Sequence, residues 1–78
     1  MPDEPRTVYD LRGLKCPLPG LKTRKRMQTL APGTLLEIET TDPLAVIDIP
    51  HFCNEDGHRL EEAAPTKGGH RFLIRKKA

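Results

Sequence analysis

The residue best suited to chemistry in this sequence is Cys16, which stands in the stretch RGLKCPLPG at residues 12–20. A cysteine thiolate is a nucleophile, and the amino terminus of a helix stabilises negative charge through its dipole and its unpaired N–H groups. Pro17 and Pro19 suit the first turn of a helix, because an N–H there has no intrahelical acceptor. We therefore expect Cys16 to be an exposed thiol at a helix start, either as the N-cap or just before a helix that begins at Pro19.

The neighbours of Cys16 bear on how readily its thiol ionises. The two prolines remove N–H donors from the first turn, so the N–H of Leu18 is the main donor left for the sulfur. Arg12 and Lys15 before the cysteine and Lys22 after it add positive potential, which favours a thiolate. We expect a modestly lowered pKa for this thiol, with the prolines fixing its direction.

Two strand patterns flank this site. TVYDL at residues 7–11 and TLLEIET at residues 34–40 alternate apolar and polar side chains. Between them, apolar or small side chains recur at helical spacing and predict a helix over residues 17–30, which APG at residues 31–33 ends. A strand, a helix and a second strand form a right-handed crossover, so the two strands should be parallel.

The second half of the chain predicts another helix, over residues 43–56. Asp42 suits its N-cap, Pro43 its first position and Gly57 its end. Pro50 cannot donate a helical hydrogen bond, so we expect a kink or two short helical pieces at that point. Asp48 would cap the second piece. The apolar side chains expected to face inward are Leu44, Ile47, Phe52 and Cys53.

The end of the chain predicts a hairpin. HRLEEAAP at residues 58–65 and HRFLIRK at residues 70–76 read as strands, and the turn-rich TKGG joins them. The expected order is βαβαββ, which favours an α/β two-layer sandwich: a mixed four-stranded sheet with two helices on one face.

Composition limits the class of protein. The chain has 78 residues, of which 36% are hydrophobic and 31% charged, so we expect a single domain spanning residues 1–78 with a thin core and no deep pocket. The stretch MPDEPR at residues 1–6 is not a leader pattern and no stretch is long and apolar enough to span a bilayer, which favours the cytoplasm and no membrane partner.

The two cysteines do not form a C-x-x-C pair, so neither a disulfide framework nor a zinc ribbon is indicated. Cys53 follows Phe52 on the apolar side of the second predicted helix, and we interpret it as core packing. His51 and His58 lie nearby, but their spacing with Cys53 matches no established zinc pattern. We expect no metal site.

The stretch DLRGLKCPLPGLKTRK at residues 10–25 resembles the C-P-x-P signature of the TusA/SirA family of small sulfur carriers. TDPLAVIDIPHFCNEDGHRL at residues 41–60 is similar to that family's second half, and RFLIRKK at residues 71–77 to its last strand. The resemblance covers nearly the whole chain, and it implies the same βαβαββ sandwich.

The resemblance also implies a function. In that family the cysteine of C-P-x-P accepts sulfur from a cysteine desulfurase or rhodanese-type donor, holds it as a persulfide, and passes it to an acceptor protein, as in tRNA thiolation or another sulfur relay. This role would fall on Cys16, with Pro17 and Pro19 shaping its loop, and no cofactor is implied. Gly20 departs from the family pattern, which generally has an apolar residue there, and costs about 1 kcal/mol of helix propensity relative to alanine.

Basic residues cluster around the predicted start of the first helix and along it. Such a run usually forms only a solvated helix face, but beside a sulfur-delivering cysteine it also suits partner docking. The predicted partner-binding residues are Arg12, Lys15, Lys22, Arg24, Lys25 and Arg26.

Two other functions remain open from the residues alone. A nucleic-acid-binding or regulatory module could use the basic first helix, although the sequence offers few aromatics for base stacking and direct nucleic-acid binding is therefore not expected. A thiol redox sensor would normally need a second cysteine close to the first.

Overall fold

The computed structural model describes residues 6–77; residues 1–5 and 78, which the single-domain prediction includes, lie outside the described residues. The elements follow one another in the predicted βαβαββ order. They are β1 (Arg6–Leu11), α1 (Leu18–Gln28), β2 (Leu35–Thr40), α2 (Ala45–Asp56), β3 (Arg59–Thr66) and β4 (Gly69–Arg75).

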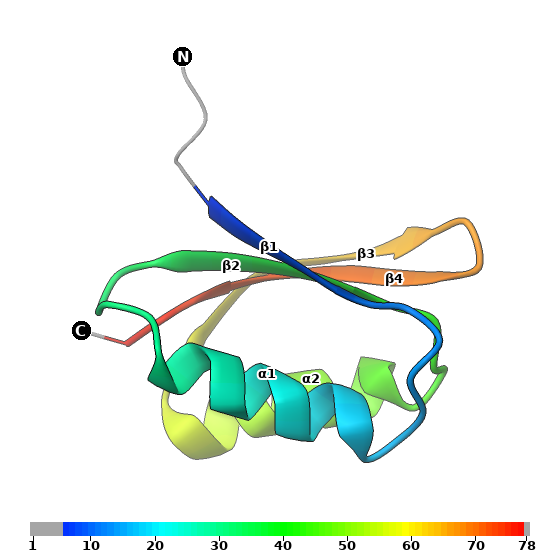
Figure 1. Cartoon of the computed structure of the whole chain (residues 1–78), viewed down its shortest axis with the longest axis horizontal. Helices are drawn as coiled ribbons and strands as arrows, with labels where there is room; N and C mark the ends of the chain where they lie inside the picture. Colours follow the sequence, from blue (N-terminus) through cyan, green and yellow to red (C-terminus); the bar gives the residue numbers. More distant parts are fainter. Residues whose placement is uncertain (1–5, 78) are drawn as a thin grey trace.

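The four strands form one mixed sheet in the order β1-β2-β4-β3. β1 and β2 are parallel, whereas β4 pairs antiparallel with both β2 and β3. Both helices cover the same face of this sheet (Figure 1). The predicted α/β two-layer sandwich and the parallel crossover are therefore confirmed.

The core lies between the sheet and the two helices. Side chains of β2 alternate, so that Leu36, Ile38 and Thr40 are buried while Glu37 and Glu39 are only partly covered. This is the period-2 pattern from which the strand was predicted. The apolar core cluster consists of Leu11, Met27, Leu36, Ile38, Ala45, Ile49, Phe52, Cys53, Phe72 and Ile74.

Helix α1 faces the sheet with Pro19, Thr23 and Met27, which are buried at a spacing of four residues. It begins one residue later than predicted, with Pro17 as the N-cap, and ends at Gln28. The remaining surface of the helix carries four basic side chains, Lys22, Arg24, Lys25 and Arg26, together with the exposed Leu18 and Leu21.

Helix α2 differs from its prediction in three respects. It is one continuous helix from Ala45 to Asp56 with Pro50 inside it, so the expected division into two pieces is wrong. The carbonyl of Val46, which Pro50 leaves without its helical donor, belongs to a residue that is 42% exposed, where water can satisfy it. The N-cap is Leu44 rather than Asp42, and the Asp42 carboxylate accepts hydrogen bonds from the N–H groups of Cys16 and Leu44.

The inward face of α2 was also predicted incorrectly in part. Phe52 and Cys53 are buried as expected, but Leu44 and Ile47 are 50% and 67% exposed. A helix that starts at Ala45 buries positions 45, 49, 52 and 53, and this face leaves positions 44 and 47 toward solvent. Gly57 ends the helix as predicted, with a φ of 77° that favours glycine.

The predicted hairpin of β3 and β4 is confirmed, with a short turn between Thr66 and Gly69. Gly69 has a structural role here, because a Cβ atom at that position would lie 1.9 Å from the carbonyl oxygen of Thr40 on β2. No helix in the described range 6–77 has the length and apolar character needed to cross a bilayer.

Candidate functional site

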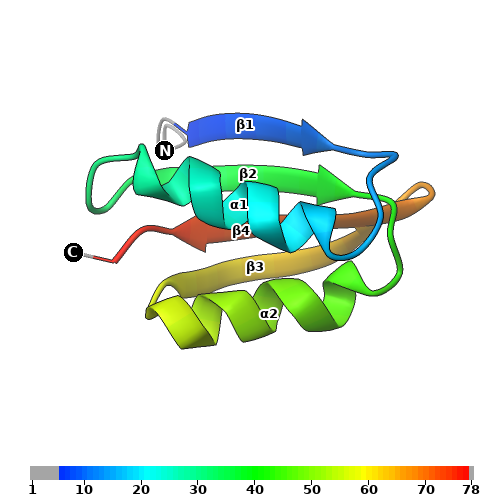
Figure 2. The ribbon, with the colours of Figure 1, turned by 60° about the horizontal axis from the view of Figure 1, so that its bottom comes forward.

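The carboxyl ends of the parallel strands β1 and β2 meet at one edge of the sheet, and both helices start there (Figure 2). The loops that leave these strands are tied together by hydrogen bonds. The N–H of Gly13 donates to Oγ1 of Thr41 at 2.8 Å, and the N–H of Cys16 donates to Oδ2 of Asp42. Cys16 is therefore held beside the start of α2 as well as that of α1.

Cys16 is exposed and directly precedes Pro17, the N-cap of α1, to which it is joined by a cis peptide bond. The first helical hydrogen bond runs from the N–H of Leu21 to the carbonyl of Pro17. Neither predicted helix start, with Cys16 as the N-cap or Pro19 as the first residue, is correct. The N–H of Leu18 donates to the carbonyl of Lys15 at 2.8 Å, so it does not serve the sulfur as predicted.

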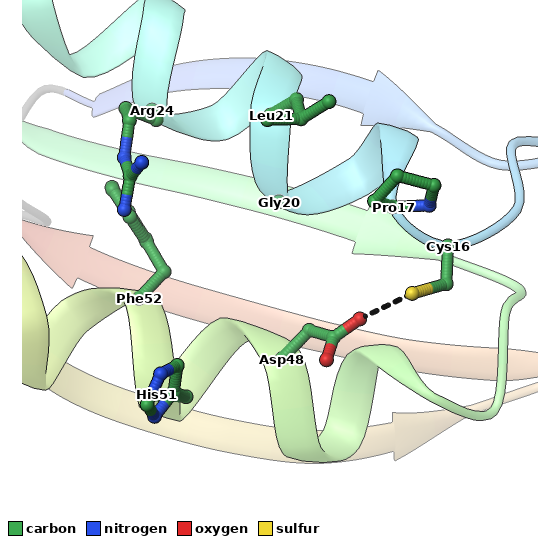
Figure 3. A pocket seen from close by; sticks show the side chains of 8 residues that line it. All are labelled: Cys16, Pro17, Gly20, Leu21, Arg24, Asp48, His51 and Phe52. Atoms are coloured by element: carbon green, nitrogen blue, oxygen red, sulfur yellow. Dashed lines mark hydrogen bonds between the residues drawn. The ribbon is translucent and has the colours of Figure 1, made fainter.

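The partner of the sulfur is Asp48. The Cys16 thiol donates a hydrogen bond to Oδ2 of Asp48, with an Sγ–Oδ2 distance of 2.8 Å (Figure 3). This hydrogen bond raises the pKa of Cys16, and burial and the negative charges of Asp48 and Asp42 act in the same direction. The expected lowering of the pKa is thus wrong, because carboxylates rather than cations lie closest to the thiol.

Sequence reasoning missed Asp48 because it assigned this residue to the cap of a second helical piece. In the continuous helix α2 it lies in the first turn, three residues after the buried Ala45, and its half-buried side chain lines the groove next to Cys16. The signal that could have identified Asp48 is its place in the chain. It is an acidic residue one turn into a helix, and this helix follows the strand that pairs with the strand before the cysteine loop.

An open groove of about 210 Å³ runs between α1 and α2 from the thiol. Cys16 and Asp48 lie at one end of the residues in Figure 3, and Arg24 and Phe52 at the other. The apolar side chain of Leu21 also lines the groove. A group bound at the thiol would thus contact both helices while remaining open to solvent.

The sequence matches a family model described as Sulfurtransferase TusA over residues 7–76. The sulfur carrier protein TusA of Pseudomonas paraeruginosa is 42% identical over 71 residues, which are 91% of this chain and 90% of that protein. The sulfur carrier protein TusA of Pseudomonas putida (strain GB-1) is 42% identical over 74 residues, which are 95% and 92% of the two chains. This chain belongs to the TusA family.

Gly20 gives this member of the TusA family an unobstructed groove. A Cβ atom at Gly20 would meet no other atom within 4 Å, so the core does not require a glycine there. Because Gly20 lines the groove, the absence of a side chain widens the space beside Cys16. Gly20 therefore affects the surface next to the thiol more than the packing of the helix.

Arg24 is the only one of the six predicted docking residues that lines the thiol groove. Its Nε lies 3.3 Å from Oδ2 of Asp56, and its guanidinium carbon lies 5.4 Å from the centroid of the Phe52 ring. An exposed ion pair of this kind contributes at most about 1 kcal/mol. Its main effect is to hold a positive charge at the end of the groove away from the thiol.

The sequence suggested that the other basic side chains of α1 gather around Cys16. In the structure they lie elsewhere. Lys22, Lys25 and Arg26 line a separate hollow of about 250 Å³ with Tyr9 of β1. The guanidinium carbon of Arg26 lies 5.3 Å from the centroid of the Tyr9 ring. The helix thus presents most of its positive charge on the side away from α2.

The two basic residues in the loop before α1 differ from each other. Arg12 donates to both carboxylate oxygens of Asp10 at 2.9 and 3.0 Å, and these bonds lower the pKa of Asp10 to about 2. Lys15 is exposed directly before the cysteine. Among the predicted docking residues, Lys15 is the closest in sequence to Cys16. Within residues 6–77 it makes no ion pair, unlike Arg12 and Arg24.

Cys53 is buried in the core, as predicted. Burial raises its pKa to about 11, with the charge of Asp56 adding to the effect. Its thiol is therefore inert at neutral pH. Within residues 6–77, no three histidine, cysteine or acidic side chains are grouped so that they could hold a metal ion.

Proposed function

We propose that this protein is a sulfur carrier that accepts sulfur on Cys16 as a persulfide and passes it to an acceptor protein. The observation that carries this proposal is the position of Cys16, an exposed thiol directly before the cap of α1 whose sulfur reaches Asp48 in the first turn of α2. The names of its TusA relatives give the same role. Pro17 and Pro19 act by fixing the turn into α1, in which Pro17 is the cap and Pro19 is buried.

The transfer chemistry follows from thiol exchange. The sulfur of Cys16 attacks the outer sulfur of a donor persulfide, and a later acceptor thiol attacks the persulfide formed on Cys16. Both steps require access, which the open groove between α1 and α2 provides. A cysteine desulfurase or a rhodanese-type protein supplies the donor persulfide, and no bound cofactor is part of the reaction.

The protein works with partners rather than as a self-sufficient enzyme. The groove beside Cys16 is shallow and open, so it does not enclose a small substrate. Donor and acceptor sites must therefore supply the remaining contacts. Lys15 and Arg24 are the predicted docking residues nearest to the path of the sulfur, and the hollow of Lys22, Lys25 and Arg26 offers a second, more basic contact area. The relay, such as tRNA thiolation, would operate in the cytoplasm, where thiols stay reduced.

Loading by a donor tests this function. We expect the purified protein, incubated with a cysteine desulfurase and free cysteine, to gain about 32 Da per sulfur atom and to lose it on treatment with a reductant. Loaded protein, separated from the donor, should then transfer the sulfur to an acceptor thiol protein. Absence of any mass gain, together with salt-sensitive binding of the unloaded protein to RNA, would instead support the nucleic-acid-binding alternative.

A further inference from the structure

We infer that Asp48 is the proton acceptor for Cys16 in sulfur transfer, an inference that rests on the function proposed above. The structural basis is the direct hydrogen bond from the Cys16 thiol to Oδ2 of Asp48 at 2.8 Å. A general base must lie within hydrogen-bonding reach of the proton that it removes, and Asp48 meets this condition before any partner binds.

The arrangement of the two residues is fixed at both ends. The main-chain N–H of Cys16 is bound to Asp42, which holds the cysteine loop against the start of α2. Asp48 lies in the first turn of α2, one turn before the buried Phe52. Both partners are thus held at the start of α2, Cys16 through its main-chain bond to Asp42 and Asp48 through the helix itself.

The Asp48 carboxylate is available to receive a proton. Within the described part of the chain, its side chain makes no ion pair and its only hydrogen bond is the one from Cys16. The nearest positive charge on the groove, Arg24, is paired with Asp56.

The charged and titratable groups around the thiol come from the two helices and from the loops that precede them. Asp42 precedes α2, Asp48 and His51 belong to α2, and Arg24 belongs to α1, while Lys15 adjoins the cysteine in its own loop. The two carboxylates dominate, and together they raise the pKa of the thiol. The resting thiol therefore keeps its proton and reacts slowly with small electrophiles.

The proton can then leave during the transfer itself. As Sγ of Cys16 attacks the outer sulfur of a donor persulfide R–S–SH, the thiol proton moves to the Asp48 carboxylate. The new Sγ–S bond forms, the S–S bond of the donor breaks, and its electron pair goes to the inner sulfur, which leaves as a thiolate. That thiolate takes the proton from Asp48, so the products are R–SH and a Cys16 persulfide with no net oxidation or reduction.

The substitution Asp48→Asn tests this role because two measurements should change in opposite directions. Loss of the carboxylate should make the thiol more acidic, so alkylation by iodoacetamide at pH 7 should become about threefold faster. Loading from a cysteine desulfurase should become slower, by at least about tenfold, because the base is missing. Asp48→Glu should restore part of the loading rate.

Glu55→Gln is the matched control, since it removes one exposed negative charge from the same helix. It should leave both rates unchanged, and circular dichroism should show that all variants are folded. Loading of Asp48→Asn that is unchanged, or that rises together with alkylation, would overturn the role of Asp48, as would an unchanged pH profile of alkylation. If the unsubstituted protein takes up no sulfur, the proposed function itself fails, and the alkylation profile then still shows whether Asp48 controls the thiol.

Discussion

The two cysteines differ in what surrounds their sulfur atoms. Cys16 is exposed and its thiol is bound to a carboxylate, whereas Cys53 is 2% exposed and lies among apolar side chains. Both environments raise a thiol pKa, but only the first leaves the sulfur within reach of another protein. Reactivity in this protein is thus decided by access and by a removable proton, and not by a permanently ionised thiol.

Burial of Cys53 predicts a specific loss of stability at high pH. Its folded-state pKa is about 11, above the ordinary value of 9.0, so the unfolded chain loses this proton first as the pH rises. The stability that the buried thiol contributes is complete below about pH 9 and is lost progressively toward pH 11. Thermal unfolding at several pH values should show this decline, and Cys53→Ala should make it shallower. An identical decline in both proteins would contradict the assignment.

Single residues were predictable from the sequence where local rules decide. Exposure of Cys16 follows from its prolines, and burial of Cys53 from its place next to Phe52. The contact of Asp48 with Cys16 joins residues 32 positions apart, and it depends on where α2 begins. No local pattern contains that information, so the direction of the thiol pKa shift was also predicted incorrectly.

The two helices have different tasks. α2 supplies Asp48 to the thiol and most of the helical core, while α1 carries the basic side chains on its exposed surface. Their side-by-side arrangement leaves the groove in which Cys16 and Asp48 meet (Figure 3). The exposed basic side chains and the carboxylate that binds the thiol therefore belong to different helices.

This separation predicts the effect of charge reversal on α1. Replacing Lys22 and Lys25 by glutamate should slow sulfur loading by about tenfold at low ionic strength, because opposite charges accelerate association. The difference should shrink as salt is added. Replacing the exposed Lys67 and Lys77 by glutamate changes the net charge equally and serves as the control. Equal slowing in both double variants would show that net charge, and not the α1 surface, is responsible.

Element types were predictable, whereas the start of each helix was not. The period of the apolar residues is enough to distinguish the strands from the helices. The helix starts depend on hydrogen bonds between loops, since the Asp42 side chain binds the N–H groups of Cys16 and Leu44 instead of capping α2. Leu44 and Ile47 lie outside the buried face that positions 45, 49, 52 and 53 form on α2.

At the scale of the whole molecule, the sheet has one covered and one open face. The open face is held by ion pairs, such as Arg71 with Glu37 and Glu62 and Arg75 with Glu61, and no helix of residues 6–77 covers it (Figure 1). The topology was predictable because a parallel crossover followed by a helix and a hairpin leaves few ways to bury both helices. It also places the ends of β1 and β2 together, which is why the site lies at that edge.

The mass of the intact protein after incubation with a cysteine desulfurase and free cysteine shows whether Cys16 carries the transferred sulfur. Cys16→Ser should abolish the gain of about 32 Da without lowering the melting temperature, because the side chain is exposed. Cys53→Ser should keep the gain but lose about 1–3 kcal/mol of stability from a buried hydroxyl. Sulfur uptake by Cys16→Ser, or uptake that requires Cys53, would show that Cys16 is not the sulfur carrier.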